Sequence, residues 1–337
     1  MTHPTLTKGT GRASTWAALL GLLLLAGCAS TPQWPDQAQT AELSQPNRQL
    51  LTEVPFYPQE AYQCGPASLA TMLNTQGLAT DPEILKELVY LPGRRGSLQV
   101  ELVAAARSHN MVAYPLKPDI EALLTEVAAG NPVLVMQNLR FNWWPQWHFA
   151  VVMGFDSQEQ ALILNTDTRQ HYEMPYKVFH ATWDRAERWA LVILPPDELP
   201  ATAETLPFLR AAHDLESTGH TVAAQRAYET AEHRWPDQPA PIMAQGNLAY
   251  DQRKPATAAS NFLRVVNRFP GFPEGWNNLA YALSASACAA QASDALACAA
   301  QLDPERFGQA GHQWTNAAGP VISECPELPA CPATIDQ

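Results

Sequence analysis

The sequence predicts two folded domains in succession, an α+β domain followed by an all-α domain built from repeats. Between residues 51 and 196, four amphipathic helical patterns come first and four apolar strand patterns follow. That order is typical of an α+β fold. Between residues 205 and 306, prolines recur at intervals of 34 residues, which indicates a helical repeat.

Composition and charge exclude several functional classes. The chain has 337 residues, of which 46% are hydrophobic, enough to build the cores of two domains. Its formal net charge of −12 disfavours a nucleic-acid partner, because phosphate groups would be repelled. The sequence contains no Cys-x-x-Cys and no His-Glu-x-x-His motif. We therefore expect no metal site and no cofactor.

Residues 1–27 have the pattern of an export signal. Positive residues precede an uncharged apolar run, Trp16 to Ala26, which is shorter than the ~20 residues of a spanning helix and is typical of a secretory signal peptide. The run ends in Leu25-Ala26-Gly27-Cys28, which resembles the lipobox of bacterial lipoproteins. The resemblance implies acylation of Cys28 and a lipid anchor, and the lack of Asp after Cys28 favours the outer membrane, facing the periplasm. Residues 28–50 are interpreted as a linker.

Local signals place each element of the first domain, residues 51–196. Cys64-Gly65-Pro66 opens the first helix, which runs through Leu73, because Pro is favoured in the first helical turn. Asp81 is the predicted cap of the second helix. The third and fourth helices are expected at residues 97–108 and 119–129. The predicted strands span residues 132–136, 149–155, 161–165 and 189–194.

Cys64 is the main candidate for a nucleophile. The prediction places it at a helix N-terminus, where the positive end of the helix dipole stabilises a thiolate and lowers the thiol pKa. His148 opens an apolar strand, from which its ring can face the helix end and accept the thiol proton. The amide of Gln59, just upstream of Cys64, can donate to a developing oxyanion.

Two strings carry a family resemblance. Gln59-Glu-Ala-Tyr-Gln-Cys64-Gly-Pro-Ala-Ser-Leu-Ala, together with His148-Phe-Ala-Val-Val-Met-Gly-Phe-Asp, resembles the C39-like peptidases of the papain-like clan. The resemblance implies a papain-like fold with Cys64 as nucleophile and His148 as base. It further implies an oxyanion hole made by Gln59 and the Cys64 backbone N–H, and a polar residue on the next strand that orients the imidazole.

Two positions depart from the pattern of many relatives. Those relatives carry the counterpart of Gln59 one residue further upstream of the catalytic Cys. Gln63, which is adjacent to Cys64, is a second candidate for the oxyanion donor. The strand after His148 lacks the Asp-Pro pair that many relatives carry. Asn165 is the predicted orienting residue, since papain-like enzymes use Asn or Asp in this role, and Asp167 is the runner-up.

Three tryptophans, Trp143, Trp144 and Trp147, lie directly before His148. In a loop beside the cleft they would bind substrate. A simple packing role over the domain is the equal alternative, and the sequence does not choose between the two.

Residues 205–306 divide into three frames of 34 residues, joined to the first domain by a linker, residues 197–204. In each frame small residues recur at fixed positions and Pro ends the second helix, at Pro236, Pro270 and Pro304. The string Trp276-Asn-Asn-Leu279-Ala280-Tyr-Ala-Leu283 resembles the opening of a tetratricopeptide repeat. This resemblance implies a concave surface for a peptide or partner protein. A spacer role is the alternative.

The cysteines other than Cys28 and Cys64 are expected to form disulfides, because an exported protein reaches an oxidising compartment. Four remain: Cys288, Cys298, Cys325 and Cys331. The first two fall ~15 Å apart on one predicted helix, too far for a bond. We expect one bridge from each to the tail, residues 307–337, in an order left open, so that the tail caps the last repeat. A Cys325–Cys331 bridge is the competing pairing.

The favoured function is a thiol-dependent peptidase of the cell envelope that acts on a peptide or protein, with repeats that bind a protein partner. The alternative is a non-catalytic binding or assembly lipoprotein that uses the repeats as its main interaction surface. In both cases the membrane contact is made by the lipid anchor.

Overall fold

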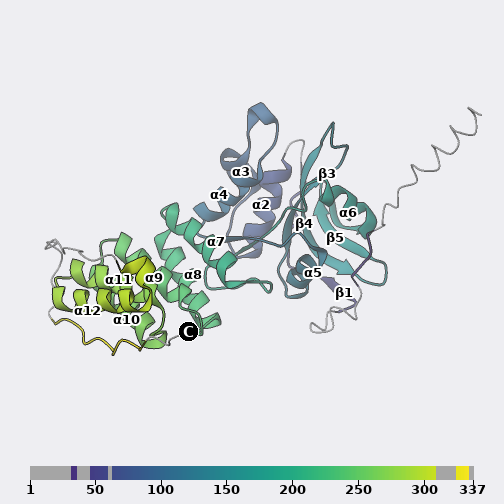
Figure 1. Ribbon diagram of the computed structural model, residues 1–337. Coiled ribbons are helices and arrows are strands. Elements are labelled where there is room, and N and C mark those ends of the chain that lie inside the picture. The colour runs from purple at the N-terminus through teal and green to yellow at the C-terminus, as the bar shows by residue number, and fades with distance from the viewer. Residues whose placement is uncertain (1–31, 36–45, 60–62, 309–323, 334–337) are drawn as a thin grey trace, which may run out of the picture. The chain divides into compact units, whose positions relative to one another are not determined.

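The structure is a computed structural model that describes residues 32–35, 46–59, 63–308 and 324–333 (Figure 1). The predicted signal peptide, Cys28 and much of the predicted linker lie outside the described residues. Among the described helices, none is long and apolar enough to cross a membrane.

The first domain is built on one antiparallel sheet. Its strands lie in the order β2-β7-β3-β4-β5-β6, and β1 pairs with β4. The strands are β1 (Arg48–Leu50), β2 (Val112–Pro115), β3 (Val133–Asn138), β4 (Trp147–Asp156), β5 (Ala161–Thr166), β6 (Arg169–Pro175) and β7 (Ala190–Leu194). All four predicted strands are confirmed, whereas β1, β2 and β6 were not predicted.

The helices of this domain confirm the four helical patterns. They are α2 (Cys64–Thr75), α3 (Pro82–Val89), α4 (Gln99–Ser108) and α5 (Ile120–Ala128), with the unpredicted α6 (Tyr176–Asp184). Asp81 caps α3 by accepting from the Ile84 N–H. Asp119 caps α5 by accepting from the Ala122 N–H.

Helices pack on the two faces of the sheet. Apolar residues of α2, α3 and α4 form one core with Met136, Phe149 and Val151 of the central strands. Neighbouring residues in a strand point to opposite faces. Gln137 accordingly points the other way, and its Nε2 donates to Thr182 Oγ1 of α6 at 2.6 Å. Both faces of the central strands are therefore covered.

Residues 48–50, expected within the linker, instead form β1. Arg48 lies opposite Asp156 in the β1–β4 register, and its guanidinium contacts that carboxylate at 2.6 Å. The strand is only three residues long, too short to show a period in the sequence. Tertiary pairing with β4 creates it, so the folded domain begins before residue 51.

The second domain consists of helix pairs. They are α7 (Thr205–Ser217) with α8 (Thr221–Arg234), α9 (Ala240–Asp251) with α10 (Pro255–Arg268), and α11 (Pro273–Ala285) with α12 (Ala289–Leu302), followed by α13 (Pro304–Phe307). The second helices begin at Thr221, Pro255 and Ala289, at intervals of 34 residues. A Cβ on Gly246 would lie 2.4 Å from the Phe262 ring, so this helix pair needs its small residue. The arrangement is compatible with a helical repeat.

Two disulfides join this domain to the tail. Cys288 is bonded to Cys325, and Cys298 is bonded to Cys331. The prediction of one bridge to the tail from Cys288 and one from Cys298 is confirmed, and the competing Cys325–Cys331 pairing is wrong. Cys288 itself lies just before α12, as its N-cap residue. Leu328, between the two tail cysteines, packs against the core of the last helices.

Candidate active site

Cys64 is the first residue of α2. It is partly exposed and is the free cysteine of the described residues. The following Gly65 is required by close approach, because a Cβ there would lie 2.3 Å from Ser97 Oγ. Gln63, the second candidate for the oxyanion donor, is buried and donates to Glu83 Oε1 on α3 at 2.8 Å. Gln63 is thus engaged elsewhere.

A cavity of about 690 Å³ surrounds the Cys64 side chain. Cys64, His148, Gln59 and Asp167 line it, together with residues 94–98 and residues 145–149. The structure therefore brings together three of the four predicted catalytic residues and the runner-up. Asn165 does not line this cavity.

His148 is held by the β5–β6 turn. Its ring is buried, and Nε2 lies 2.7 Å from Thr166 Oγ1. The same nitrogen lies 3.6 Å from Asp167 Oδ1. No hydrogen bond joins the Cys64 thiol to this ring in the described part of the chain, although both line one cavity. Such contacts are often long in enzymes without substrate.

The predicted contact between Asn165 and His148 is wrong. Asn165 donates to the Pro55 carbonyl at 3.3 Å and accepts from the His171 N–H at 3.2 Å. In the β4–β5 register Asn165 lies opposite Val151. Val151 is an odd number of residues from His148 along β4, so their side chains point to opposite faces of the sheet. Asn165 shares the face of Val151 and therefore points away from His148. Thr166 points to the face of His148.

Asp167 links three parts of the site. Its φ of 49° places it in the left-handed region, which Asp tolerates in tight turns. Its carboxylate contacts Arg169 Nη2 at 3.0 Å as well as His148. Its carbonyl accepts from the Gln59 N–H at 2.9 Å. The turn that holds the imidazole therefore also holds the backbone of the predicted oxyanion donor.

The Gln59 amide lies beside β4. Its Nε2 is 3.5 Å from Ser68 Oγ and 3.5 Å from the Phe149 carbonyl. Both contacts are long and weak, and Oε1 is buried without a partner. Weakly held donors of this kind are free to turn toward a bound oxyanion.

Burial shifts both reactive groups toward their neutral forms. It raises the pKa of the Cys64 thiol, and the charge of Asp167 adds to this, while backbone hydrogen bonds from Phe149 and Gly65 oppose it. Burial lowers the pKa of the His148 imidazole, against the opposing effect of Asp167. Burial therefore shifts the thiol pKa in the direction opposite to the depression expected from the helix N-terminus, because desolvation outweighs the backbone hydrogen bonds to the thiol.

The three tryptophans differ in their position relative to the cavity. Trp147 lines the cavity and is 51% exposed. Trp143 and Trp144 are 77% and 62% exposed and do not line it. The ring of Trp143 stacks on Phe141 with centroids 5.6 Å apart. Only Trp147 is therefore placed to touch a molecule bound at Cys64, and none of the three packs over the core.

Thr166 and the α3–α4 loop were missed by the sequence reasoning. Strand alternation, counted from His148 across a known register, would have selected Thr166 over Asn165. The loop residues carry no local signal, since only the tertiary structure brings residues 94–98 to Cys64. No group of three or more His, Cys, Asp or Glu within the described ranges is arranged to hold a metal ion.

Comparison with known proteins gives one family match. Residues 51–191 match the model of the Peptidase_C39 like family. No curated protein matches the chain.

The solved structures that resemble the chain at low identity include the following three. A protein described as a C39-like peptidase from Bacillus anthracis is 21% identical, covering 44% of this chain and 97% of its own, with a TM-score of 0.36. The peptidase domain of Streptococcus ComA, a bifunctional ABC transporter of a quorum-sensing pathway, is 22% identical, covering 42% and 99%, with a TM-score of 0.35. A double-glycine-motif protease from an AMS/PCAT transporter, solved with a leader peptide, is 22% identical, covering 43% and 96%, with a TM-score of 0.32.

The antiparallel sheet with α2 packed against it carries Cys64 and His148 to one cavity, within the stretch that the family model matches. Residues 51–191 thus resemble the C39-like peptidases, the family whose model they match.

Proposed function

We propose that the chain is a thiol-dependent peptidase of the cell envelope, with Cys64 as nucleophile and His148 as general base. The observation that carries the proposal is the cavity that Cys64 shares with His148, Gln59 and Asp167. The match of residues 51–191 to a peptidase family supports the same reaction class.

In the first step His148 acts as a base toward a neutral thiol. In the tautomer that donates from Nε2 to Thr166 Oγ1, 2.7 Å away, Nδ1 is left to accept the thiol proton. As that proton moves, Cys64 Sγ bonds to the carbonyl carbon of the scissile bond, and the carbonyl π electrons pass to oxygen. Because burial favours the neutral thiol, proton transfer accompanies the attack.

In the second step the tetrahedral intermediate collapses. The C–N bond breaks, the leaving amine takes the proton from His148, and the acyl group stays on Cys64 as a thioester. Water then attacks the thioester with His148 as base, releasing a carboxylic acid and the thiol. Gln59 Nε2 and the Cys64 backbone N–H are the proposed donors to the oxyanion of both intermediates.

For residues 205–306 we propose a tetratricopeptide-like surface that binds a peptide or protein partner. Two adjoining hollows support this. One of about 340 Å³ and one of about 240 Å³ share Asn247 and Tyr250. Tyr228 lines the first and Tyr281 the second. Tyrosine rings and amides suit the backbone and apolar side chains of an extended peptide.

Export and lipid anchoring at Cys28, at the outer membrane and facing the periplasm, complete the proposal. The bonds Cys288–Cys325 and Cys298–Cys331 support export, because disulfides persist in oxidising compartments.

The test is cleavage of a proteome-derived peptide library by the full chain, with new N-termini identified by mass spectrometry. Wild type should generate new N-termini, and Cys64→Ala and His148→Ala should generate none. His180→Ala changes a histidine on α6 that does not line the cavity, so it serves as the matched control and should cleave like wild type. Cleavage that persists in Cys64→Ala, or is absent from wild type, contradicts the proposal.

The second candidate is a non-catalytic envelope protein that works through its repeats. The raised pKa of the Cys64 thiol favours it, because a neutral thiol is a poor nucleophile. On this alternative Cys64→Ala leaves the cellular role intact. Tyr250→Ala, in both hollows of the repeat domain, abolishes it.

A further inference from the structure

Two stretches of the chain supply most of the residues that line the cavity around Cys64. The loop between α3 and α4 contributes Arg94 to Leu98, and the start of β4 with the two residues before it contributes Pro145 to Phe149. The Leu91 N–H donates to the Gly96 carbonyl at 2.9 Å, closing the α3–α4 loop on itself. Both arginines of this closed loop line the cavity.

The charges of Arg94 and Arg95 are not balanced. Neither has a carboxylate partner in the described part of the chain, whereas seven other arginines do: Arg48, Arg107, Arg169, Arg188, Arg264, Arg268 and Arg306. Asp167, the acid that lines the cavity, already contacts Arg169 and His148. Within the described residues, the cavity therefore carries two arginine side chains without a carboxylate partner beside the free thiol.

This local charge opposes the charge of the whole molecule. The chain has a formal net charge of −12, yet its proposed nucleophile lies in a cavity lined by two arginines and one aspartate. A cleft of one sign concentrates ligands of the opposite sign. The guanidinium group can make two parallel hydrogen bonds to one carboxylate. Two adjacent arginines therefore suit an acidic side chain better than a single point-like positive charge would.

We propose that Arg94 and Arg95 form a subsite for a carboxylate, and that substrates are peptides with Asp or Glu close to the bond that is cleaved. This rests on the proposed function and specifies its substrate class. Trp147 also lines the cavity, with half of its surface exposed. It offers an apolar face to the peptide between the acidic residue and the scissile bond.

The first test measures the electrostatic potential around the Cys64 thiol and does not require peptidase turnover. The rates of Cys64 alkylation by anionic iodoacetate and neutral iodoacetamide are compared in the full chain, with the modified peptide identified by mass spectrometry. In Arg94→Gln and Arg95→Gln the iodoacetate-to-iodoacetamide ratio should fall, by about ten-fold in the double variant at low salt. Lys177→Gln removes one charge from α6, outside the cavity, and should leave the ratio unchanged. A ratio that does not change in the double variant overturns the proposal.

The second test measures selectivity in binding. Rhodamine-labelled hexapeptide mixtures that contain Glu, Gln or Lys in an otherwise identical alanine background are titrated against the Cys64→Ala full chain by fluorescence anisotropy. The Glu set should bind most tightly, and adding Arg94→Gln and Arg95→Gln should reduce its affinity to that of the Gln set. Equal binding of the three sets overturns the proposal.

The two proposals fail in different ways. Alkylation and peptide binding both proceed in a chain without peptidase activity. If the charge preference is found and library cleavage is absent, the proposed reaction is wrong. If cleavage occurs without preference for acidic residues, the carboxylate subsite is wrong and the proposed reaction stands.

Discussion

At the scale of single residues, the His148 imidazole depends on the turn between β5 (Ala161–Thr166) and β6 (Arg169–Pro175). Thr166 Oγ1 contacts Nε2 at 2.7 Å, and Asp167 stands farther off at 3.6 Å. Thr166 is buried, whereas the Asp167 side chain is 46% exposed and shared with Arg169. Thr166 is therefore the stronger positioning contact.

Replacing Thr166 by Val should lower kcat/KM about 10- to 100-fold, the equivalent of one lost hydrogen bond to a group that becomes charged. Asp167→Asn should cost less, because solvent screens its carboxylate. Asn165→Ala is the control and should leave kcat/KM unchanged, because its amide bonds Pro55 and His171 instead. The measurement is steady-state kinetics on any substrate found in the library. A larger loss of kcat/KM in Asn165→Ala than in Thr166→Val would contradict the assignment of Thr166 as the positioning residue.

The direction of the two pKa shifts predicts the pH profile. Because burial raises the pKa of the Cys64 thiol, its iodoacetamide rate should be slow at neutral pH and climb through alkaline pH, as the thiolate appears. Because burial lowers the pKa of His148 from 6.5, the imidazole stays a free base in mild acid. The acid limb of kcat/KM should therefore lie below pH 6.5. An alkylation rate that is already at its plateau at pH 7 would refute the direction of the thiol shift, and an acid limb above pH 6.5 would refute that of the imidazole.

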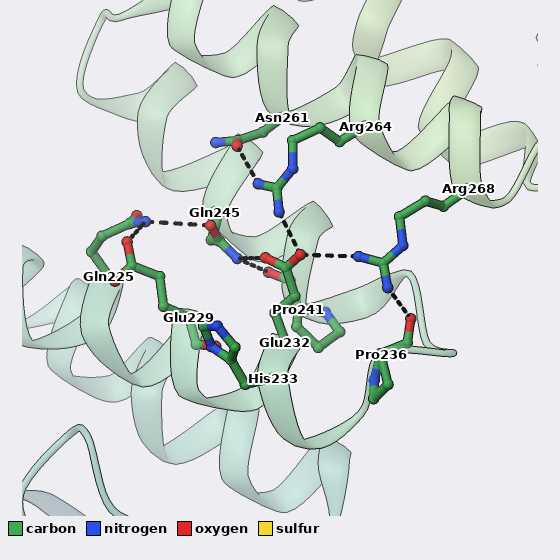
Figure 2. A network of polar contacts seen from close by, with 10 residues as sticks. All are labelled: Gln225, Glu229, Glu232, His233, Pro236, Pro241, Gln245, Asn261, Arg264 and Arg268. Atoms are coloured by element: carbon green, nitrogen blue, oxygen red, sulfur yellow. Dashed lines mark hydrogen bonds and ion pairs between the residues drawn. The ribbon is translucent and has the colours of Figure 1, made fainter.

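At the scale of elements, a polar network joins neighbouring helix pairs. Figure 2 shows the Glu232 carboxylate of α8 (Thr221–Arg234) facing Gln245 of α9 and Arg264 and Arg268 of α10. Gln245 Nε2 donates at 2.9 Å and Arg268 Nη1 at 3.0 Å, and Arg264 also donates. The Glu232 side chain is 15% exposed. Burial alone would raise its pKa, but the bonds from Gln245 and Arg264 outweigh it and lower the pKa.

Replacing Glu232 by Gln should lower the free energy of unfolding by about 1–2 kcal/mol at pH 7, since charge-assisted bonds to partly exposed arginines are lost. A depressed carboxyl pKa stabilises the fold above the ordinary value and loses that effect as pH falls. The difference from wild type should therefore shrink below pH 4.5. Glu229→Gln, on the exposed side of α8 with one bond to Gln225, is the control for urea denaturation. Equal destabilisation by both variants would argue against a network.

At the scale of the whole chain, a buried carboxylate fixes the segment between the two domains. Glu126 of α5 is fully buried. It accepts from Asn131 Nδ2 at 2.7 Å, the Ala201 N–H at 3.1 Å, the Thr202 N–H at 2.8 Å and Thr202 Oγ1 at 2.5 Å. The predicted linker, residues 197–204, is thus bound to the first domain through this side chain.

Replacing Glu126 by Ala should destabilise the chain by about 3 kcal/mol, because the part-buried donors of Asn131, Ala201 and Thr202 lose their charged acceptor. It should also speed proteolysis between residues 197 and 204, where the backbone is released. Limited proteolysis with peptide mapping measures this. Glu121→Ala, at the exposed start of the same helix, should leave the cleavage rate unchanged. A linker that stays protected in Glu126→Ala would show that other contacts hold it.

The lipid anchor is also a prediction about the whole chain. Mature protein should begin at Cys28, carry acyl chains and sediment with membranes, since two or more chains anchor stably. Cys28→Ala should change the mass and release the protein to the soluble fraction. Intact-protein mass spectrometry and fractionation measure this, and a variant equally bound to membrane contradicts it.

Local signals in the sequence determined much of this protein. The 34-residue spacing of Pro236, Pro270 and Pro304 predicted helices whose starts recur at that interval. Cys64-Gly65-Pro66 predicted the start of α2. The helical rise alone kept Cys288 and Cys298 from bonding to each other. These features depend on neighbours a few residues away, so they can be predicted without the fold.

The tertiary structure alone decided the rest. Strand register placed Thr166, not Asn165, on the face of His148. Pairing with distant strands created β1, which has too few residues to show a period, and the fold brought Arg94 and Arg95 to the cavity of Cys64. Burial reversed the expected direction of the thiol pKa. Register, edge pairing and desolvation all depend on residues far apart in the chain, and no local pattern encodes them.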